Sequence, residues 1–319
     1  MTTDTLISPT EQATRWLDDF GRALARGDID ATLALFDADC YWRDLVAFTW
    51  NIRTQEGPAA IRAMLQARLA DTKPSNFAIE GEATEADGIT DAWLTFETGV
   101  ARGRGHLRLK GGKAWTLLTT MTELKGHEEK KGEHRIKGAE HGVHPGRKSW
   151  AEQREDEAKS LGYTEQPYVV IVGGGQGGIM LGARLRRLGV TAIIVEKNAR
   201  PGDSWRNRYK SLCLHDPVWY DHLPYLPFPD DWPVFAPKDK IGDWLEMYTK
   251  VMELNYWGST VCKKASFNEK TQEWEVQVER DGKPVTLRPK ELVFALGVSG
   301  YPNVPKIPGA ETFLGDQHH

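Results

Sequence analysis

The chain has 319 residues, about twice the length of a typical single domain, so we expect two domains. Its 41 Lys and Arg residues nearly balance its 45 Asp and Glu residues, and the net charge of -4 argues against a bulk nucleic-acid binder. No stretch is long and apolar enough for a membrane helix, and residues 1–10 lack the features of a signal peptide. The three cysteines are widely spaced and fit a reducing compartment, so we expect a cytoplasmic protein.

Residues 8–125 predict a domain in which helices precede an antiparallel sheet. Apolar residues recur at helical spacing in three segments, 11–27, 29–36 and 58–69. From residue 77 the apolar period changes to two, which predicts strands at 76–80, 92–98, 105–109 and 114–124. Helices first and a curled sheet afterwards make an α+β domain.

Residues 126–149 differ from both flanking regions, because they are charged, rich in glycine and poor in apolar side chains. This composition predicts a solvated linker. The segment contains four histidines, and imidazole is a common metal ligand: His127, His134, His141 and His144. Histidines in a charged linker without packed surroundings are more often simply exposed, so we predict no metal site.

Residues 150–319 begin with a polar helix, 150–160, and continue into a βαβ unit. A continuous apolar run at 168–172 predicts a strand that is covered on both faces, as in a parallel sheet. A helix follows over 176–188, and the next strand covers 191–196. This pattern predicts an α/β Rossmann-type domain.

The turn between this strand and this helix reads Gly173-Gly-Gly-Gln-Gly-Gly178 and contains the pattern GxGxxG. The pattern alone is weak evidence. Here, however, it joins a buried strand to a helix, and an acidic residue, Glu196, follows 23 positions after Gly173. Gly173 permits the tight turn, Gly175 lets the backbone approach a pyrophosphate, and Gly178 lets helix and strand pack closely.

The helix that begins at this turn offers free N–H groups and a positive dipole end to the phosphates of a dinucleotide. Glu196 can accept hydrogen bonds from both hydroxyls of an adenosine ribose, and its charge would repel a 2′-phosphate. The sequence therefore predicts a dinucleotide site, for FAD or NAD. The alternative is a glycine-rich turn of a doubly wound sheet that binds no ligand.

The long loop after Glu196 distinguishes FAD from NAD. It is rich in proline and aromatic residues, whereas a plain NAD domain runs directly into its next helix. The loop closely resembles that of the class B flavoprotein monooxygenases, a family that includes flavin-containing, Baeyer–Villiger and YUCCA-type monooxygenases. Gly202-Asp-Ser-Trp205 matches the family's Gly-Gly-x-Trp, with Asp203 in place of Gly. Two further segments, Leu214-His215 and 223–229, are most similar to the YUCCA-type branch. The strand 291–302 also matches the family, and 313–319 fits its pattern FxGxxxH through Phe313, Gly315 and His319.

The resemblance covers about residues 165 to 319 and implies that the domain binds FAD and uses NADPH as reductant. It also implies that the reduced flavin takes up O2 as a C4a-hydroperoxide, which transfers one oxygen atom to a small organic substrate. The implied cofactor-binding residues are Gly173, Gly175, Gln176, Gly177, Gly178, Glu196, Lys197, Ser204, Trp205 and His215. The catalytic residues stay unknown, because the chemistry belongs to the cofactor and the sequence shows no catalytic triad or carboxylate pair.

Some of these positions also have ordinary structural interpretations. Trp205 can be a simple buried tryptophan, and His215 with Asp216 can cap a turn before a proline. Cys213 and Cys262 are interpreted as packing residues rather than catalytic ones.

The family continues past FxGxxxH into a second domain with its own GxGxxG for NADPH, and the 319 residues contain no second such motif. The sequence therefore predicts the front half of a monooxygenase, with an FAD-binding domain incomplete at its C-terminus. Two other functions stay open. One is a flavoprotein reductase or dehydrogenase. The other is a non-catalytic NTF2-like binding or dimerisation protein with a degenerate or truncated FAD-binding half.

Residues 8–125 resemble the NTF2-like (SnoaL-like) cone fold, through Gly27-Asp28 between two helices and the segment 35–42 that leads to the sheet. Such cones usually enclose a pocket, and the candidate lining residues are Tyr41, Trp42, Asp44, Trp93 and His106. Tyr41 and Asp44 are candidates for acid–base work. We favour a dimerisation or substrate-guarding role, with a homodimer through this domain as the expected assembly.

Overall fold

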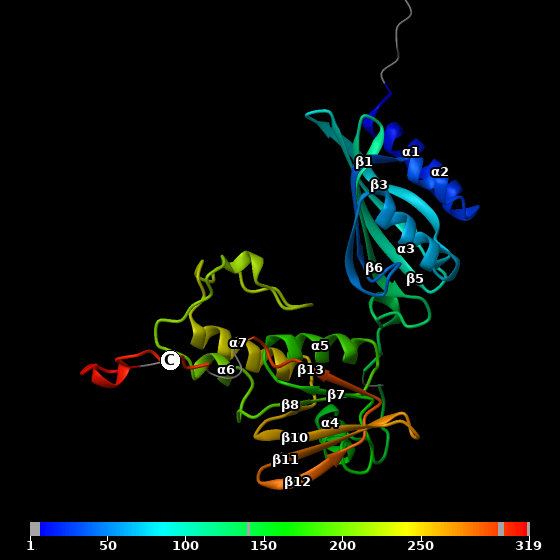
Figure 1. Cartoon of the computed structure of the whole chain (residues 1–319). Helices are drawn as coiled ribbons and strands as arrows, with labels where there is room; N and C mark the ends of the chain where they lie inside the picture. The colour runs from blue at the N-terminus through cyan, green and yellow to red at the C-terminus, as the bar shows by residue number, and fades with distance from the viewer. Residues whose placement is uncertain (1–6, 139–140, 299–302, 318–319) are drawn as a thin grey trace, which may run out of the picture. The chain divides into compact units, whose positions relative to one another are not determined.

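The computed structural model describes residues 7–138, 141–298 and 303–317 (Figure 1). The chain divides into two compact units, Met1–Glu128 and Glu129–His319. The division falls early in the segment 126–149, for which the sequence predicts a linker. Most of that segment, from Glu129 onward, belongs to the second unit.

The first unit packs three helices against a six-stranded sheet. The helices are α1 (Pro9–Ala25), α2 (Ile29–Ala34) and α3 (Gly57–Thr72). The strands, in sheet order, are β2 (Ile52–Glu56), β1 (Phe36–Leu45), β6 (Lys113–Leu124), β5 (Ala101–Lys110), β4 (Ile89–Glu97) and β3 (Ser75–Ala86). All neighbouring strands are antiparallel except β1 and β6, which are parallel. This architecture confirms the α+β class, and β1 and β2 are additional to the predicted strands.

Helix α1 begins where the Ser8 hydroxyl accepts a hydrogen bond from the backbone N–H of Glu11 at 3.2 Å. Its apolar face carries Trp16 and Phe20, whose rings stack and contact the edge of Phe36 from β1. Burial of one phenylalanine side chain contributes about 1.5 to 3 kcal/mol. This aromatic cluster, with the fully buried Trp42, holds the helices on one face of the sheet.

The second unit is built on a parallel sheet in the order β13 (Glu291–Phe294), β7 (Val169–Val172), β8 (Ala192–Val195) and β9 (Tyr256–Trp257). Helix α5 (Gln176–Arg187) connects β7 to β8, and α7 (Lys238–Val251) precedes β9. The βαβ unit confirms the Rossmann-type expectation, and its elements end within two residues of the predicted bounds.

Strand β7 is buried on both faces because successive side chains pack into different clusters. Val170 and Val172 contact Trp257 and an antiparallel sheet. That sheet consists of β10 (Thr260–Asn268), β11 (Glu273–Arg280) and β12 (Lys283–Leu287). Val169 and Ile171 face the opposite way and pack with the apolar side of α5. The continuous apolar run in the sequence therefore has the predicted cause.

Shorter elements complete the second unit. They are α4 (Trp150–Ser160), α6 (Asp203–Arg206) and the 3-10 turns Gly132–His134, Val218–Tyr220 and Ala310–Thr312. Within the described ranges, no helix has the length and apolar character needed to span a membrane.

Candidate cofactor site

The glycine-rich turn follows β7 directly, and two of its glycines stand where the backbone is crowded. Gly173 has a φ of 110°, and a Cβ atom there would lie 2.4 Å from the carbonyl oxygen of Ala295, just after β13. A Cβ atom on Gly178 would lie 2.0 Å from the carbonyl oxygen of Gly173. These two glycines therefore let three backbone segments pack closely, as the motif requires.

Gly175 and Gly177 face open space instead, since a Cβ atom on either would meet no atom within 4 Å. Gly175 is the N-cap residue of α5 and provides no side-chain cap, whereas Ser8 and Asp28 cap α1 and α2. The first-turn N–H groups and the dipole of an uncapped helix attract anions. The side of the turn that these two glycines face is therefore open, and the uncapped helix end favours an anion there.

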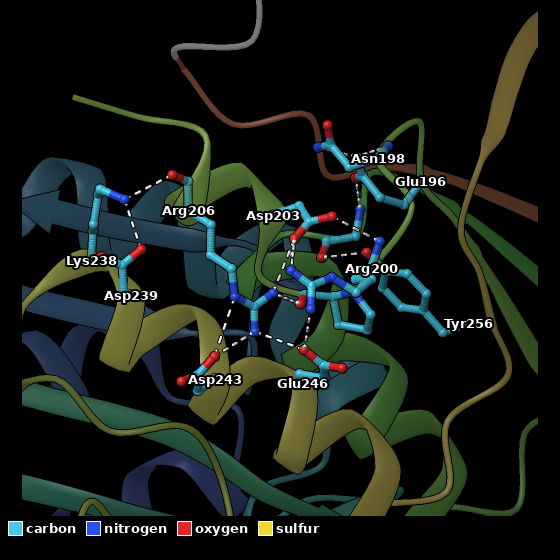
Figure 2. Close-up of polar contacts among 12 residues, drawn as sticks. Glu196, Asn198, Arg200, Asp203, Arg206, Lys238, Asp239, Asp243, Glu246 and Tyr256 are labelled. Carbon is cyan, nitrogen blue, oxygen red and sulfur yellow. Dashed lines mark hydrogen bonds and ion pairs between the residues drawn. The ribbon is translucent and has the colours of Figure 1, made fainter. Parts of the chain in front are cut away.

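Glu196 follows β8 and lies beside the turn, with 8% of its surface exposed. Its Oε2 accepts a hydrogen bond from Gly174 N at 2.7 Å, and its Oε1 accepts from the backbone N and Nδ2 of Asn198 at 2.9 and 2.7 Å (Figure 2). A carboxylate has about four acceptor positions, so these bonds to described residues leave one for a ribose hydroxyl. Glu196 also fixes the turn, a role that the sequence pattern did not indicate.

Tyr256 packs against the same turn from β9. Its hydroxyl donates to the carbonyl oxygen of Gly174 at 3.2 Å, and a Cβ atom on Gly174 would lie 2.4 Å from that hydroxyl. Burial and the nearby charges of Glu196 and Asp203 raise the pKa of Tyr256, so the hydroxyl stays a donor at neutral pH. Because 82 residues separate Tyr256 from Gly174, no local sequence pattern could have linked them.

Trp205 reaches the turn from α6, a helix of four residues that starts after Gly202. The indole Nε1 donates to Oε1 of Gln176 at 3.2 Å, and Gln176 is the first residue of α5. The structure therefore brings Trp205 and Gln176, two of the predicted site residues, together at the amino end of the helix that faces the open space.

Asp203 stands where the family motif has glycine, and its contacts explain the departure. Its carboxylate accepts hydrogen bonds from the backbone N of Arg200 at 3.1 Å and from Nη1 of Arg206 at 3.0 Å (Figure 2). Arg206 also contacts Asp243 and Glu246 on α7. The loop before Trp205 is thus tied to α7 through an ion cluster, which the sequence did not predict. Arg206 and Asp203 are mostly buried in it, whereas the side chains of Asp243 and Glu246 are 78% and 43% exposed.

The other candidate residues lie at the surface. Ser204, Lys197 and His215 are exposed, and His215 pairs with its neighbour Asp216 at 3.6 Å. Among the described residues, Ser204 and His215 form no hydrogen bond with the glycine-rich turn. Their predicted role in cofactor binding therefore gains no support from hydrogen bonding and stays a prediction.

The FxGxxxH stretch lies only partly within the described residues. Phe313 is 60% exposed and follows the 3-10 turn Ala310–Thr312, whereas His319 falls outside the described ranges. Residues 299–302 of the matching strand segment 291–302 fall outside them as well.

The five candidate pocket residues of the first unit do not share one face of the sheet. Trp42 and Asp44 are fully buried, while Tyr41 and Trp93 are 37% and 41% exposed. The acid–base pairing of Tyr41 with Asp44 is therefore wrong, because residues three apart on a strand point to opposite faces. Tyr41 instead donates a hydrogen bond to Asp39 at 3.0 Å.

Asp44 has a structural role inside the first unit. Its carboxylate accepts hydrogen bonds from the backbone N–H groups of Phe48 and Thr49 and from the Thr49 hydroxyl. A fourth donor is the hydroxyl of Thr119, which accepts from Nε1 of Trp42 at 2.9 Å. These bonds fix the turn after β1 and satisfy a carboxylate that would otherwise be costly to bury.

His106 lies on the exposed face of the sheet and not in a pocket. Its Nε2 lies 2.6 Å from Oδ1 of Asp91, and its ring centroid lies 4.5 Å from that of Trp93. The guanidinium carbon of Arg104 also lies over the Trp93 ring, 4.1 Å from its centroid. Across the described part of the chain, no group of three or more His, Cys, Asp or Glu side chains is arranged to hold a metal ion.

Both units of the chain match known protein families. Residues 14–120 match the SnoaL-like domain family, residues 166–211 match the FAD binding domain family, and residues 198–319 match the flavin-binding monooxygenase-like family. These matches confirm both resemblances that the sequence shows, to the SnoaL-like domains and to the class B flavoprotein monooxygenases.

Individual relatives match about half of the chain or less. Indole-3-pyruvate monooxygenase YUCCA1 of Oryza sativa subsp. japonica is 36% identical over 155 residues, which are 48% of this chain and 37% of that protein. A CzcO-like oxidoreductase of Geobacillus kaustophilus is 40% identical over 86 residues, 27% of this chain and 25% of that protein. The flavin-containing monooxygenase from Stenotrophomonas maltophilia shares 27% identity over 47% of this chain and 44% of its own, with a TM-score of 0.42. The chain thus matches between a quarter and little more than a third of the length of these two curated relatives.

Proposed function

We propose that this chain, which joins a SnoaL-like domain to a flavin-binding monooxygenase-like region, supplies the FAD-binding part of a flavin-dependent monooxygenase. The enzyme would use NADPH and insert one oxygen atom of O2 into a small organic substrate. In the overall reaction, one substrate, one O2, one NADPH and one proton would give the oxygenated product, one water and one NADP+. The bound flavin supplies the redox chemistry, and the protein binds, orients and shields it.

One observation carries this proposal, namely the open space in front of Gly175 at the uncapped amino end of α5. The N–H groups there would hold the pyrophosphate of FAD, and the remaining acceptor position of Glu196 would hold a ribose hydroxyl. Trp205, at the same helix end, would pack beside the cofactor. The match of residues 166–211 to the FAD binding domain family supports FAD over other dinucleotides.

The substrate is proposed by similarity to the relatives of the second unit. Several of them are named as indole-3-pyruvate monooxygenases, so a small aromatic 2-oxo acid is the first class to test. The proposal requires no catalytic acid or base from the described residues, because the flavin would supply the redox chemistry.

The same proposal includes the domain boundaries at 8–125, 126–149 and 150–319, a cytoplasmic location and a homodimer.

The homodimer would form through the face of the first sheet that none of the described helices covers. Side chains on that face include Tyr41, Trp93 and Ile52, the last of which is 65% exposed. Light scattering of the intact chain and of Trp93→Glu tests this assembly. The proposal expects a dimer that the substitution weakens, and a monomeric wild-type chain would contradict it.

The decisive test measures FAD binding first and then the stoichiometry of O2 and NADPH consumption with indole-3-pyruvate. The proposal expects saturable FAD binding by this chain. In the holoenzyme to which it supplies the FAD-binding part, the proposal expects O2 uptake equal to substrate-dependent NADPH oxidation. NADPH oxidation without O2 consumption would overturn the monooxygenase assignment while leaving the flavin site intact. A flavin-free, stably dimeric chain that cannot take up FAD would instead favour the non-catalytic binding or dimerisation protein.

A further inference from the structure

Helix α6 carries Trp205 to the amino end of α5, yet the helix is too short to hold its own orientation. It has four residues, and isolated helices of fewer than about 12 residues have little stability in water. The position of Trp205 must therefore come from tertiary contacts. The contact of its indole N–H with Gln176 is a single hydrogen bond of 3.2 Å, so further contacts must fix the helix.

Trp205 itself packs against an apolar cluster that includes Ile179 of α5 and Leu245 of α7, and its neighbour Arg206 adds the polar contacts that hold α6. Its side chain is 13% exposed, and all five of its N–H donors have acceptors (Figure 2). Nη1 donates to the carbonyl oxygen of Pro201 at 2.9 Å and to Asp203 at 3.0 Å. Nη2 donates to Asp243 at 2.8 Å and Glu246 at 2.7 Å, and Nε donates to Asp243 at 3.3 Å.

Two glycines let this guanidinium reach α7 without a gap. Gly202, at the start of α6, has a φ of 87°, and a Cβ atom there would lie 2.2 Å from the carbonyl oxygen of Gly242 on α7. A Cβ atom on Gly242 would lie 2.8 Å from Cγ of Arg206. The backbones of α6 and α7 are therefore in direct contact at the ion cluster.

Arg206 is the cation that contacts all three carboxylates of the cluster. Three carboxylates, those of Asp203, Asp243 and Glu246, contact its guanidinium. Arg200 assists only at longer distances, 3.4 Å from Asp203 and 3.8 Å from Glu246. The planar fork of arginine can serve acceptors in several directions at once, whereas the three donors of a lysine ammonium cannot reproduce that pattern.

We propose that Arg206 is a positioning residue of the flavin site, which holds α6 against α7 so that Trp205 stays at the amino end of α5. The effect on flavin rests on the proposed function. The effect on Trp205 does not, because it concerns the protein without cofactor.

The test uses Arg206→Lys, which keeps the charge and removes the fork. The matched control is Arg186→Lys, because Arg186 on α5 also bridges two carboxylates, Glu157 at 3.1 Å and Glu253 at 3.4 Å, away from the glycine-rich turn. The chains carry 5-fluorotryptophan, and the 19F resonance of Trp205 is assigned by its absence in Trp205→Phe. FAD affinity is measured on the same samples by fluorescence anisotropy.

The proposal expects Arg206→Lys to shift or broaden the Trp205 resonance in the cofactor-free chain and to weaken FAD binding about tenfold or more, as the loss of one or two charge-assisted hydrogen bonds would. Arg186→Lys should leave the resonance in place and change FAD affinity less than about twofold, because it disturbs none of these bonds. If Arg206→Lys does not fold, Asp243→Asn, which weakens one partner, should show the same shift to a smaller extent.

An unchanged Trp205 resonance in folded Arg206→Lys would overturn the proposal. Equal losses of FAD affinity in Arg206→Lys and Arg186→Lys would overturn it too, since they would indicate general destabilisation. If the wild-type chain binds no FAD, the proposed function fails, and the resonance of the cofactor-free chain still decides the role of Arg206.

Discussion

The substitution Gly175→Ala separates the fold of the glycine-rich turn from its binding function. Gly175 has φ -75° and ψ -173°, an extended backbone that alanine adopts readily, and its Cβ atom would meet no protein atom within 4 Å. The cost to the fold is the N-cap preference of glycine over alanine, about 1 kcal/mol or less. The methyl group, however, would occupy the space in which the pyrophosphate approaches the backbone.

The loss of binding follows from the hydrogen bonds that the methyl group prevents. A hydrogen bond to a charged group contributes about 1.5 to 3 kcal/mol, so the loss of even one weakens FAD binding at least about tenfold. Gly178→Ala is the matched comparison, because its Cβ atom would collide with Gly173 at 2.0 Å. Overpacking costs about 1 to 3 kcal/mol, partly offset by about 1 kcal/mol of better helix propensity. Gly178→Ala should therefore lower both stability and FAD affinity.

The assay combines urea unfolding of the cofactor-free chain with equilibrium FAD titration of each variant. Gly175→Ala should keep its unfolding free energy within about 1 kcal/mol of wild type and lose FAD affinity. Gly175→Ala that binds FAD as tightly as wild type would refute the placement of the pyrophosphate in front of this turn.

Three further outcomes are expected. Asp44→Ala should destabilise the first unit by about 3 kcal/mol in urea unfolding, because it leaves several buried donors without an acceptor; a loss below about 1 kcal/mol would contradict this role. Burial acts to raise the pKa of Asp91, but the hydrogen bonds from Arg108 and His106 outweigh it and lower that pKa. The ionised Asp91 therefore stabilises the fold above its unfolded pKa of about 3.9, and this stabilisation is lost as pH falls through the folded value. Asp91→Asn should therefore flatten the decline in stability between about pH 5 and about pH 3, and an unchanged decline would argue against the pairing. Glu196→Gln should weaken FAD binding about tenfold in the same titration, since a neutral amide cannot accept hydrogen bonds at both of its ends; unchanged affinity would place the ribose elsewhere.

The sequence predicts the βαβ unit well because local pattern and tertiary environment agree there. The apolar run 168–172 is buried by layers on both faces, and Gly173 and Gly178 stand where close backbone packing leaves no room for a side chain. By contrast, β1 places Asp44 at a buried position of its alternation, where a strand pattern leads one to expect an apolar side chain. Phe48 and Thr49 are near Asp44 in the sequence, but the sequence could not show that Thr119 also donates to Asp44, because the two become neighbours only when β6 pairs with β1.

The candidate site was predictable where it consists of one contiguous motif and unpredictable where it joins distant segments. The glycine-rich turn and Trp205 follow from the motif and the family resemblance. The contacts of Tyr256 with Gly174 and of Arg206 with α7 depend on strand order and helix packing. Asp203 departs from the family pattern, and only the structure shows that its carboxylate accepts a hydrogen bond from Arg206.

The most direct test of the central claim is a calorimetric titration of the wild-type chain with FAD, accompanied by Gly175→Ala. We expect saturable binding of one FAD per chain with a dissociation constant of about 10 µM or tighter, near -7 kcal/mol, and at least about tenfold weaker binding in the variant. A folded wild-type chain that shows no saturable binding at about 1 mM FAD, which limits any binding energy to about -4 kcal/mol, would contradict it.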